Sequence, residues 1–337
     1  MLKAKWLSPW LLLLSLAVTP FAANSQDNNW ALFKQSFLAS DGRIVDHENK
    51  NISHSEGQGY GMLLAVMYND QAAFELIWQW THNTLLRKSL WLFAWRYDPV
   101  LQKVTDDNNA TDGDTLIAWA LLLAGKQWHN QSYLDASNNI QDALINCLII
   151  EQGEEALLLP GLSGFTRDDG YIINPSYFIF PAWDSFWQER HNAIWQRLKK
   201  SSLALLDKAR FGKTQLPSDW VFVNNNGDVT PADSWPPRFS YDAIRIPLYL
   251  SMGAAQQDSM DNFRHFWSGY TRTETPAWVD VSGEGQASYE MSGGILAVRD
   301  LTMGDYQRMD KTLRPGEGYY LSALHMLSLF AASLKGG

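Results

Sequence analysis

The sequence feature that most constrains the fold is a recurring alternation of helical apolar patterns with glycine- or proline-rich connections. Within each pattern the apolar residues return every three to four positions, as on one face of an α-helix. Strand-like alternation is scarce, and its clearest case is WVFVNNNGDVTP at 220–231, which predicts a hairpin with NNNG as the turn. The predicted helices span residues 28–39, 57–81, 113–128, 132–151, 176–188, 191–208, 241–253, 259–267, 285–297 and 318–334.

About ten helices without a series of parallel strands predict an all-α fold with a small β-hairpin excursion. Such helices can stack as a solenoid, close into a ring or form a plain bundle, and the periodicity does not choose among these arrangements. The sequence has no low-complexity linker and no exact repeat, so we expect a single folded domain.

The N-terminal segment has the order of a secretory signal peptide. Lys3 and Lys5 precede a short apolar run, which a segment rich in small residues follows. We therefore expect a leader over residues 1–23, a single domain over 24–337 and a periplasmic or secreted product. A retained membrane anchor is the alternative, although the apolar run is short for a membrane span.

Charge and cysteine usage restrict the partners. The formal net charge is −9, and it becomes −11 if Lys3 and Lys5 leave with the leader, which argues against nucleic acid and anionic membranes. Cys147 is the single cysteine, and its apolar neighbours predict a buried structural thiol. The seven histidines form no HExxH motif and no Cys/His cluster, so neither a metal nor another cofactor is predicted.

Tryptophan is several times more frequent than usual, with 16 in the chain and 14 after removal of the leader. Much of it must pack in a core, but indole faces also stack on the apolar faces of sugar rings. An acidic, tryptophan-rich, exported chain therefore favours a polysaccharide partner.

Glu56 lies in SEGQGYGM at 55–62, where a predicted helix begins. With Ser53 three positions earlier, it fits the capping box S-x-x-E, which is one interpretation. A capping box does not explain the three alternating glycines, each of which costs about 1 kcal/mol in a helix relative to alanine. We expect these glycines to let a neighbouring helix or a ligand approach the backbone beside Glu56.

Asp112 and Asp114 lie in ATDGDTLIAWALLLAGKQW at 110–128. Helix capping is one interpretation, because aspartate at a helix start satisfies free backbone N–H groups. A calcium loop fails as another, because its third and twelfth ligand positions would be Ala110 and Trp119. Capping needs one acid and not two.

Asp242 and Arg245 are three positions apart in RFSYDAIRIPLYL, so they share a helix face. One interpretation is a cap with a surface ion pair. In the other, the arginine keeps the carboxylate ionised, as a general base requires. Hydrolysis of a glycosidic bond needs two carboxyl groups in different protonation states, and these helix ends could bring such groups together. Glu56 would be the acid only if desolvation or an anionic neighbour such as Asp112 outweighed the helix dipole.

Together these stretches resemble glycoside hydrolase family 8. SEGQGYGM is similar to the family's acid motif, the 110–128 stretch to its signature, and SYDAIRIP at 240–247 to the motif of the base; NPSYF at 174–178 matches a further family stretch. The resemblance implies an (α/α)6 barrel of six helical hairpins with a long cleft. Within the family, the leader and the size are most similar to the periplasmic endo-β-1,4-glucanase associated with bacterial cellulose synthase.

The resemblance also implies residue roles. Glu56 is the expected general acid, Asp242 the general base, and Asp112 the aspartate that binds the sugar at the cleavage subsite. The family inverts the anomeric carbon, so we expect about 6.5–9.5 Å between the acid and the base. Asp114 is expected to cap its helix. The expected substrate-binding residues are Arg245, which orients the base, Tyr177 near the attacking water, Trp95 as a stacking platform with Trp91 as its rival, and Tyr241.

The implied substrate is β-1,4-glucan, as cellulose or cello-oligosaccharides, and we expect the alternating glycines to let this flat chain pass close to Glu56. A monomer with a functional association with a cellulose synthase complex is expected. The first rival function is the same chemistry on xylan, chitosan or mixed-linkage glucan. The second is a non-catalytic glucan-binding protein. A helical polysaccharide lyase is disfavoured by the acidic charge.

Overall fold

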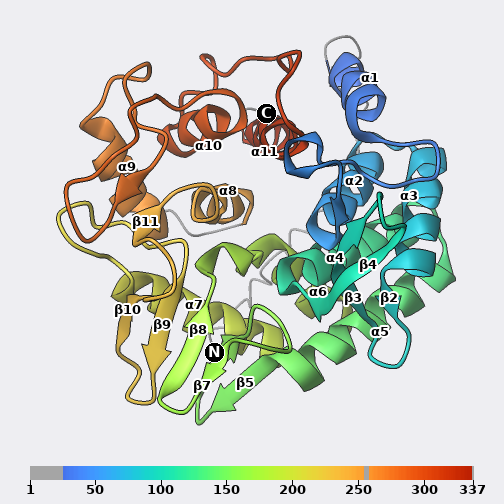
Figure 1. The fold of residues 1–337 in the computed structure, drawn as a ribbon, viewed down its shortest axis with the longest axis horizontal. Coiled ribbons are helices and arrows are strands. Elements are labelled where there is room, and N and C mark those ends of the chain that lie inside the picture. Colours follow the sequence, from blue (N-terminus) through green and yellow to red (C-terminus); the bar gives the residue numbers. More distant parts are fainter. Residues whose placement is uncertain (1–25, 254–257, 336–337) are drawn as a thin grey trace, which may run out of the picture.

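A ring of α-helices forms the body of the protein in the computed structural model, which describes residues 26–253 and 258–335 (Figure 1). The leader predicted over residues 1–23 lies outside the described residues. The α-helices of the described part are α1 (Gln26–Phe37), α2 (Ser55–Met67), α3 (Gln71–Thr84), α4 (Thr111–Gln127), α5 (Gln131–Leu148), α6 (Phe180–Arg190), α7 (Ile194–Lys208), α8 (Arg245–Met252), α9 (Asp261–Ser268), α10 (Gly293–Met303) and α11 (Tyr319–Ser333).

The helices close on themselves. Helices α2, α4, α6, α8 and α11 contact one another in sequence, and α11 returns to α2, so the two ends of the described chain lie side by side (Figure 1). Helices α3, α5 and α7 pack on α2, α4 and α6, respectively. Of the three arrangements that the periodicity left open, the ring is confirmed, and the fold is the predicted (α/α)6 barrel.

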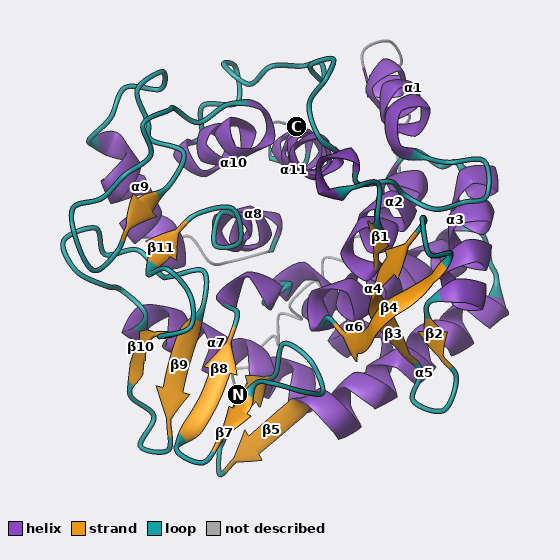
Figure 2. Cartoon of the chain, viewed as in Figure 1, coloured by secondary structure: helices purple, strands orange, loops and turns teal. Residues whose placement is uncertain are grey.

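Strands are more extensive than the sequence predicted (Figure 2). The predicted hairpin is confirmed as β9 (Val221–Asn224) and β10 (Val229–Pro231), but it belongs to a four-stranded sheet of order β10-β9-β8-β7. A second, unpredicted hairpin consists of β3 (Leu92–Asp98) and β4 (Lys103–Asn109). The remaining strands are short: β1 (Ser53–His54), β2 (Leu86–Arg87), β5 (Ile149–Gln152), β6 (Glu155–Leu158), β7 (Thr166–Arg167), β8 (Gly170–Ile173), β11 (Arg238–Phe239) and β12 (Val279–Asp280). The described residues also form the 3-10 turns η1 (His47–Asn49), η2 (Pro175–Tyr177) and η3 (Asp258–Met260).

The bounds of most predicted helices shift by a few residues, and two predicted stretches differ more strongly. The stretch 57–81 is two helices, because Asn69 has a left-handed φ of 53° and Asp70 caps α3 by accepting a hydrogen bond from the Ala73 N–H. The stretch 285–297 becomes helical only at Gly293, because the residues before it pair across to the 275–279 segment through backbone hydrogen bonds.

The glycines of the Glu56 stretch serve helix packing. A Cβ on Gly59 would lie 2.5 Å from the Leu116 Cβ on α4, and a Cβ on Gly61 would lie 2.7 Å from the Ile44 side chain. Gly113 on α4 allows the same close approach from the facing helix, since a Cβ at this position would lie 2.2 Å from the Ser55 Oγ on α2. The idea that Gly59 and Gly61 clear a path for a glucan chain is therefore wrong. They let α2 approach its neighbours.

Two further observations concern the helices. Cys147 on α5 is free and half-buried against the core, so it is less buried than predicted. Within residues 26–253 and 258–335, no helix is both long and apolar enough to cross a membrane.

Candidate active site

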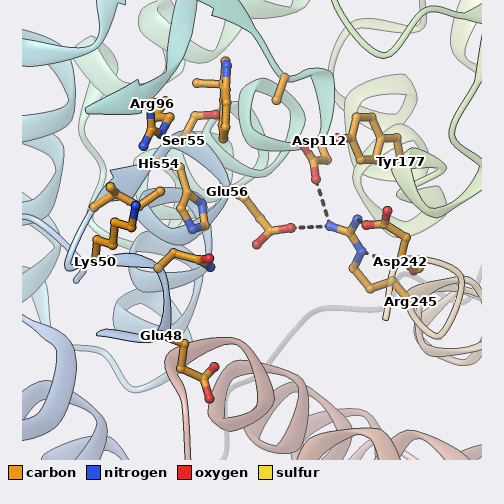
Figure 3. A pocket seen from close by; sticks show the side chains of 14 residues that line it. Glu48, Lys50, His54, Ser55, Glu56, Arg96, Asp112, Tyr177, Asp242 and Arg245 are labelled. Carbon is orange, nitrogen blue, oxygen red and sulfur yellow. Dashed lines mark hydrogen bonds and ion pairs between the residues drawn. The ribbon is translucent and has the colours of Figure 1, made fainter. Parts of the chain in front are cut away.

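Arg245, the first residue of α8, is the centre of the candidate site (Figure 3). Its side chain is 1% exposed. One terminal nitrogen, Nη1, donates to the Glu56 Oε2 and, at 2.8 Å, to the Asp112 Oδ2. The other, Nη2, donates to the Ser176 Oγ and to the Asp242 Oδ1, both at 2.7 Å. A single guanidinium therefore binds all three carboxyl groups that the sequence analysis predicted to be catalytic.

Glu56 is placed by the start of α2. The capping-box interpretation is wrong, because Ser53 belongs to β1 and His54 is the N-cap, with its Nδ1 accepting from the Gly57 N–H at 3.3 Å. The Glu56 Oε1 accepts a 2.6 Å hydrogen bond from the phenol of Tyr319 on α11. With Arg245 on Oε2, both oxygens of Glu56 are bound.

Asp112 and Asp114 on the first turn of α4 have separate functions. Asp112 accepts from Arg245 and from the Gly113 N–H. Asp114 does not cap the helix as predicted. It accepts from the Phe93 N–H of β3 at 2.8 Å and from the Asn109 amide of β4 at 2.7 Å, so it fastens the β3–β4 hairpin to α4.

Asp242 lies in the loop before α8 and caps no helix, since the N-cap of α8 is Ile244. Its ion pair with Arg245 is confirmed, but the arginine is buried and not at the surface. The second oxygen of Asp242 accepts from the indole N–H of Trp220 at 3.2 Å.

The carboxyl groups border a pocket of about 500 Å³. Asp242 is the most accessible of the three, with 37% of its side chain exposed, against 16% for Glu56 and 3% for Asp112. The lining residues are Glu48, Asn49, Lys50, Ile52, His54, Ser55, Glu56, Trp95, Arg96, Ala110, Asp112, Tyr177, Asp242 and Arg245.

The predicted substrate-binding residues divide between the pocket and its surroundings. Trp95 on β3 and Tyr177 line the pocket, and Arg245 stacks over the Tyr177 ring at 5.5 Å. Trp91 does not line it; it lies in the turn before β3 and packs against the core. Tyr241 is 39% exposed beside Asp242, and its hydroxyl is 3.3 Å from that of Tyr289.

Burial dominates the electrostatics. It raises the pKa of Asp112 to about 7, and the charge of Glu56 adds to the rise while Arg245 opposes it. Burial also raises the pKa of Asp242, again against Arg245. Burial raises the pKa of Tyr319 well above its usual value, so its phenol stays a neutral donor to Glu56.

Several site residues escaped the sequence analysis. Ser176 lies inside the quoted NPSYF stretch, so that motif could have revealed it. Tyr319, Trp220 and Asp219 have no local pattern that points to them, because their role is visible only through contacts across the barrel. In the described part of the chain, no group of three or more His, Cys, Asp or Glu residues is arranged to hold a metal ion.

Comparison with known proteins adds independent findings. Residues 2–333 match the model of the family described as glycosyl hydrolases family 8. The chain is 48% identical over 277 residues to an endoglucanase of Cellulomonas uda, with 82% of this chain and 77% of that protein covered. Its structure resembles that of endoglucanase Cel10 from Klebsiella pneumoniae, with a TM-score of 0.89, 45% identity and coverage of 92% and 100%. It also resembles an endo-β-1,4-glucanase from an Achatina fulica gut metagenomic library, with a TM-score of 0.88, 47% identity and coverage of 94% and 99%.

Proposed function

Because the chain belongs to glycosyl hydrolase family 8, we propose that it is an endo-β-1,4-glucanase that cleaves internal bonds of cellulose or cello-oligosaccharides with inversion at the anomeric carbon. The observation that carries this proposal is the gathering of Glu56, Asp112 and Asp242 on Arg245 at one pocket. The names of the similar proteins support the choice of β-1,4-glucan.

The exposure of the carboxyl groups supports their roles. Asp242 reaches solvent most, and it accepts hydrogen bonds on both oxygens, so it suits the base that activates water. Glu56 lines the same pocket and shares Arg245 with Asp242, so an acid and a base can act on one bound glucan. Asp112 lines the same pocket but is almost closed to solvent, so it is the least suited of the three to activate water and is left for sugar binding.

The charge balance supports a retained proton. Three ionised carboxyl groups on one guanidinium would carry a net charge of −2 in a largely buried cluster. We therefore propose that the cluster keeps one proton at neutral pH and that Glu56 delivers it to the leaving group. The raised pKa of Asp112, about 7, accords with a proton shared within the cluster.

The anomer released first tests the mechanism. Proton NMR of a cello-oligosaccharide digest should show the α-anomer before mutarotation, because water attacks the face opposite the acid. Early release of the β-anomer would overturn the inverting mechanism.

A polymer panel tests the substrate. Release of reducing ends from carboxymethylcellulose should exceed release from xylan, chitosan and mixed-linkage glucan. A higher specific activity on one of the other polymers would replace cellulose as the substrate, and binding without release of reducing ends would favour a glucan-binding protein.

The cellular setting is also part of the proposal. The leader pattern supports export to the periplasm or medium, and the resemblance to synthase-associated enzymes supports a role in cellulose biosynthesis. Mass spectrometry of the N-terminus from a periplasmic fraction should show removal of residues 1–23. Light scattering should report a monomer.

A further inference from the structure

Asp219 and Trp220 connect the β-sheet to the loop that carries Asp242. They immediately precede β9, and the Trp220 carbonyl accepts from the Ala232 N–H at 3.0 Å. The Asp219 N–H donates to the Arg238 carbonyl at 2.6 Å. The backbone of this pair is therefore hydrogen-bonded at two points to the segment 232–243, which contains β11 and leads to Asp242.

Trp220 holds the carboxylate of Asp242 directly. Its indole N–H donates to Oδ2 at 3.2 Å, while Arg245 binds Oδ1. The indole ring is stacked on Phe165, with centroids 5.7 Å apart, and on Trp235, with centroids 4.6 Å apart. These two neighbours fix the plane of the indole and so the direction of its N–H.

Asp219 holds the backbone on both sides of Asp242. One oxygen accepts from the N–H of Ser240 at 2.9 Å and from the N–H of Ala243 at 2.8 Å, and the other accepts from the Ser240 hydroxyl. Burial and the charge of Asp242 raise the pKa of Asp219 to about 6. A second acidic group therefore lies close to Asp242 without contacting the pocket.

We propose that Asp219 and Trp220 are positioning residues for Asp242 with opposite electrostatic effects. Trp220 stabilises the ionised carboxylate through a donated hydrogen bond, whereas Asp219 fixes the turn and opposes ionisation through its own charge. This inference rests on the assignment of Asp242 as general base in the proposed function.

The other charged and titratable groups around Asp242 come from five elements and are unchanged by substitutions at 219 and 220. They are Arg245 on α8, Glu56 on α2, Asp112 on α4, Tyr177 on η2 and Tyr320 on α11. Because they stay the same in all variants, a shift in the titration of Asp242 reports the two positioning residues.

The first test is Trp220→Phe, with Trp235→Phe as its matched control. Both variants keep an aromatic stack, but only the first removes the donor to Asp242. We expect Trp220→Phe to raise the pKa of Asp242 by about 0.5–1 unit. Carboxyl ¹³C NMR of the resting protein measures this pKa, with the Asp242 signal assigned by its loss in Asp242→Asn. The acid limb of kcat/KM on carboxymethylcellulose should shift by the same amount.

The second test is Asp219→Asn, whose amide oxygen can still accept from Ser240 and Ala243. Loss of the nearby charge should lower the pKa of Asp242 by about 0.5 unit, opposite in sign to the first variant. If Asp219 were merely structural, its replacement would lower stability without shifting the pKa of Asp242. Thermal unfolding of each variant confirms that a folded protein is titrated.

The outcomes test the roles of Trp220 and Asp219 separately from each other and from the proposed function. An unchanged Asp242 titration in Trp220→Phe, or an equal shift in Trp235→Phe, overturns the role of Trp220. An upward shift or none in Asp219→Asn overturns the role of Asp219. The NMR titration needs no substrate. An inactive wild type would therefore refute the proposed function, while the effect of each substitution on the pKa of Asp242 could still be measured.

Discussion

The candidate site has two walls that are built differently. The helical wall comprises Glu56, Asp112 and Arg245 on the first turns of α2, α4 and α8, with side chains 16%, 3% and 1% exposed. The loop wall comprises Asp242, 37% exposed, with Asp219 and Trp220 behind it. Helix packing fixes the first wall, and hydrogen bonds from side chains fix the second. Substitutions in the helical wall should therefore affect stability as well as chemistry.

The largest expected effect concerns chemistry in the helical wall. Glu56→Gln should lower kcat by roughly 10²–10⁴-fold, because the amide cannot donate the proton that the leaving group needs. Binding of a cello-oligosaccharide, measured by calorimetry, should remain. Glu48→Gln is the matched control, since Glu48 lines the same pocket without an ion pair to Arg245, and its rate should stay near that of the wild type. Equal losses in both variants would contradict the assignment.

The next effect concerns the cation that joins the two walls. Arg245→Met should lower the free energy of unfolding by about 3–5 kcal/mol at pH 7, because it leaves buried carboxylates without a partner. The loss should shrink toward pH 5 as these groups take up protons. Denaturant unfolding measures it, with Arg167→Met as the control, because the solvent-screened pair of Arg167 with Asp233 should contribute little to stability. A loss independent of pH would count against the charge argument.

A third effect measures what burial costs at Asp114, which lies on the same first turn of α4 as Asp112. Burial raises the pKa of Asp114 from 3.8 to about 7. Between these values the folded protein keeps a proton that the unfolded chain releases, so the free energy of unfolding falls as pH rises from about 4 to about 7. Asp114→Asn should remove this fall, which amounts to on the order of a few kcal/mol in the free energy of unfolding between about pH 4 and about pH 7. Denaturant unfolding at several pH values measures it. The exposed Asp233→Asn should leave the slope unchanged, and an unaltered slope in Asp114→Asn would refute the prediction.

The smallest effect tests how closely the helices behind the wall must pack. Gly59→Ala should cost about 1–3 kcal/mol, because its Cβ would lie 2.5 Å from the Leu116 Cβ. Gly57→Ala is the internal control: its nearest contact, to the Tyr319 ring, would be 3.5 Å, so the change should stay under about 1 kcal/mol. Turnover by the folded fraction should survive in both. A loss of kcat in Gly59→Ala without a loss of stability would restore the idea that a ligand needs this glycine.

The sequence predicted the fold where the pattern is local. Most helices follow the apolar period, but the break at Asn69 and Asp70 was missed because apolar residues continue on both sides of it. The β3–β4 hairpin was missed because most of β4 is exposed and shows no apolar alternation. Its position depends instead on Asp114, through contacts 21 and 5 residues away in the sequence.

The same division applies to the site. The carboxyl groups of the helical wall and Asp242 lie in recognisable stretches, so sequence reasoning found them. The hydrogen-bond partners of these groups could not be predicted from local sequence, because Trp220 is 22 residues from Asp242 and Tyr319 is 263 residues from Glu56. The capping box failed because the start of α2 is fixed by His54, and pairing of Ser53 with Tyr97 in β3 removed it from the helix. Local spacing cannot report such long-range pairing.

The hydrogen bond between Tyr319 and Glu56 has a consequence for the order in which the protein becomes functional during its own synthesis. A ribosome makes α2 long before α11, so a nascent or truncated chain that ends before Tyr319 can form several helix pairs but cannot close the barrel around Glu56. Such fragments would be inert and not weakly active. Catalysis would begin as a single late event, when the far end of the polypeptide docks beside the near one.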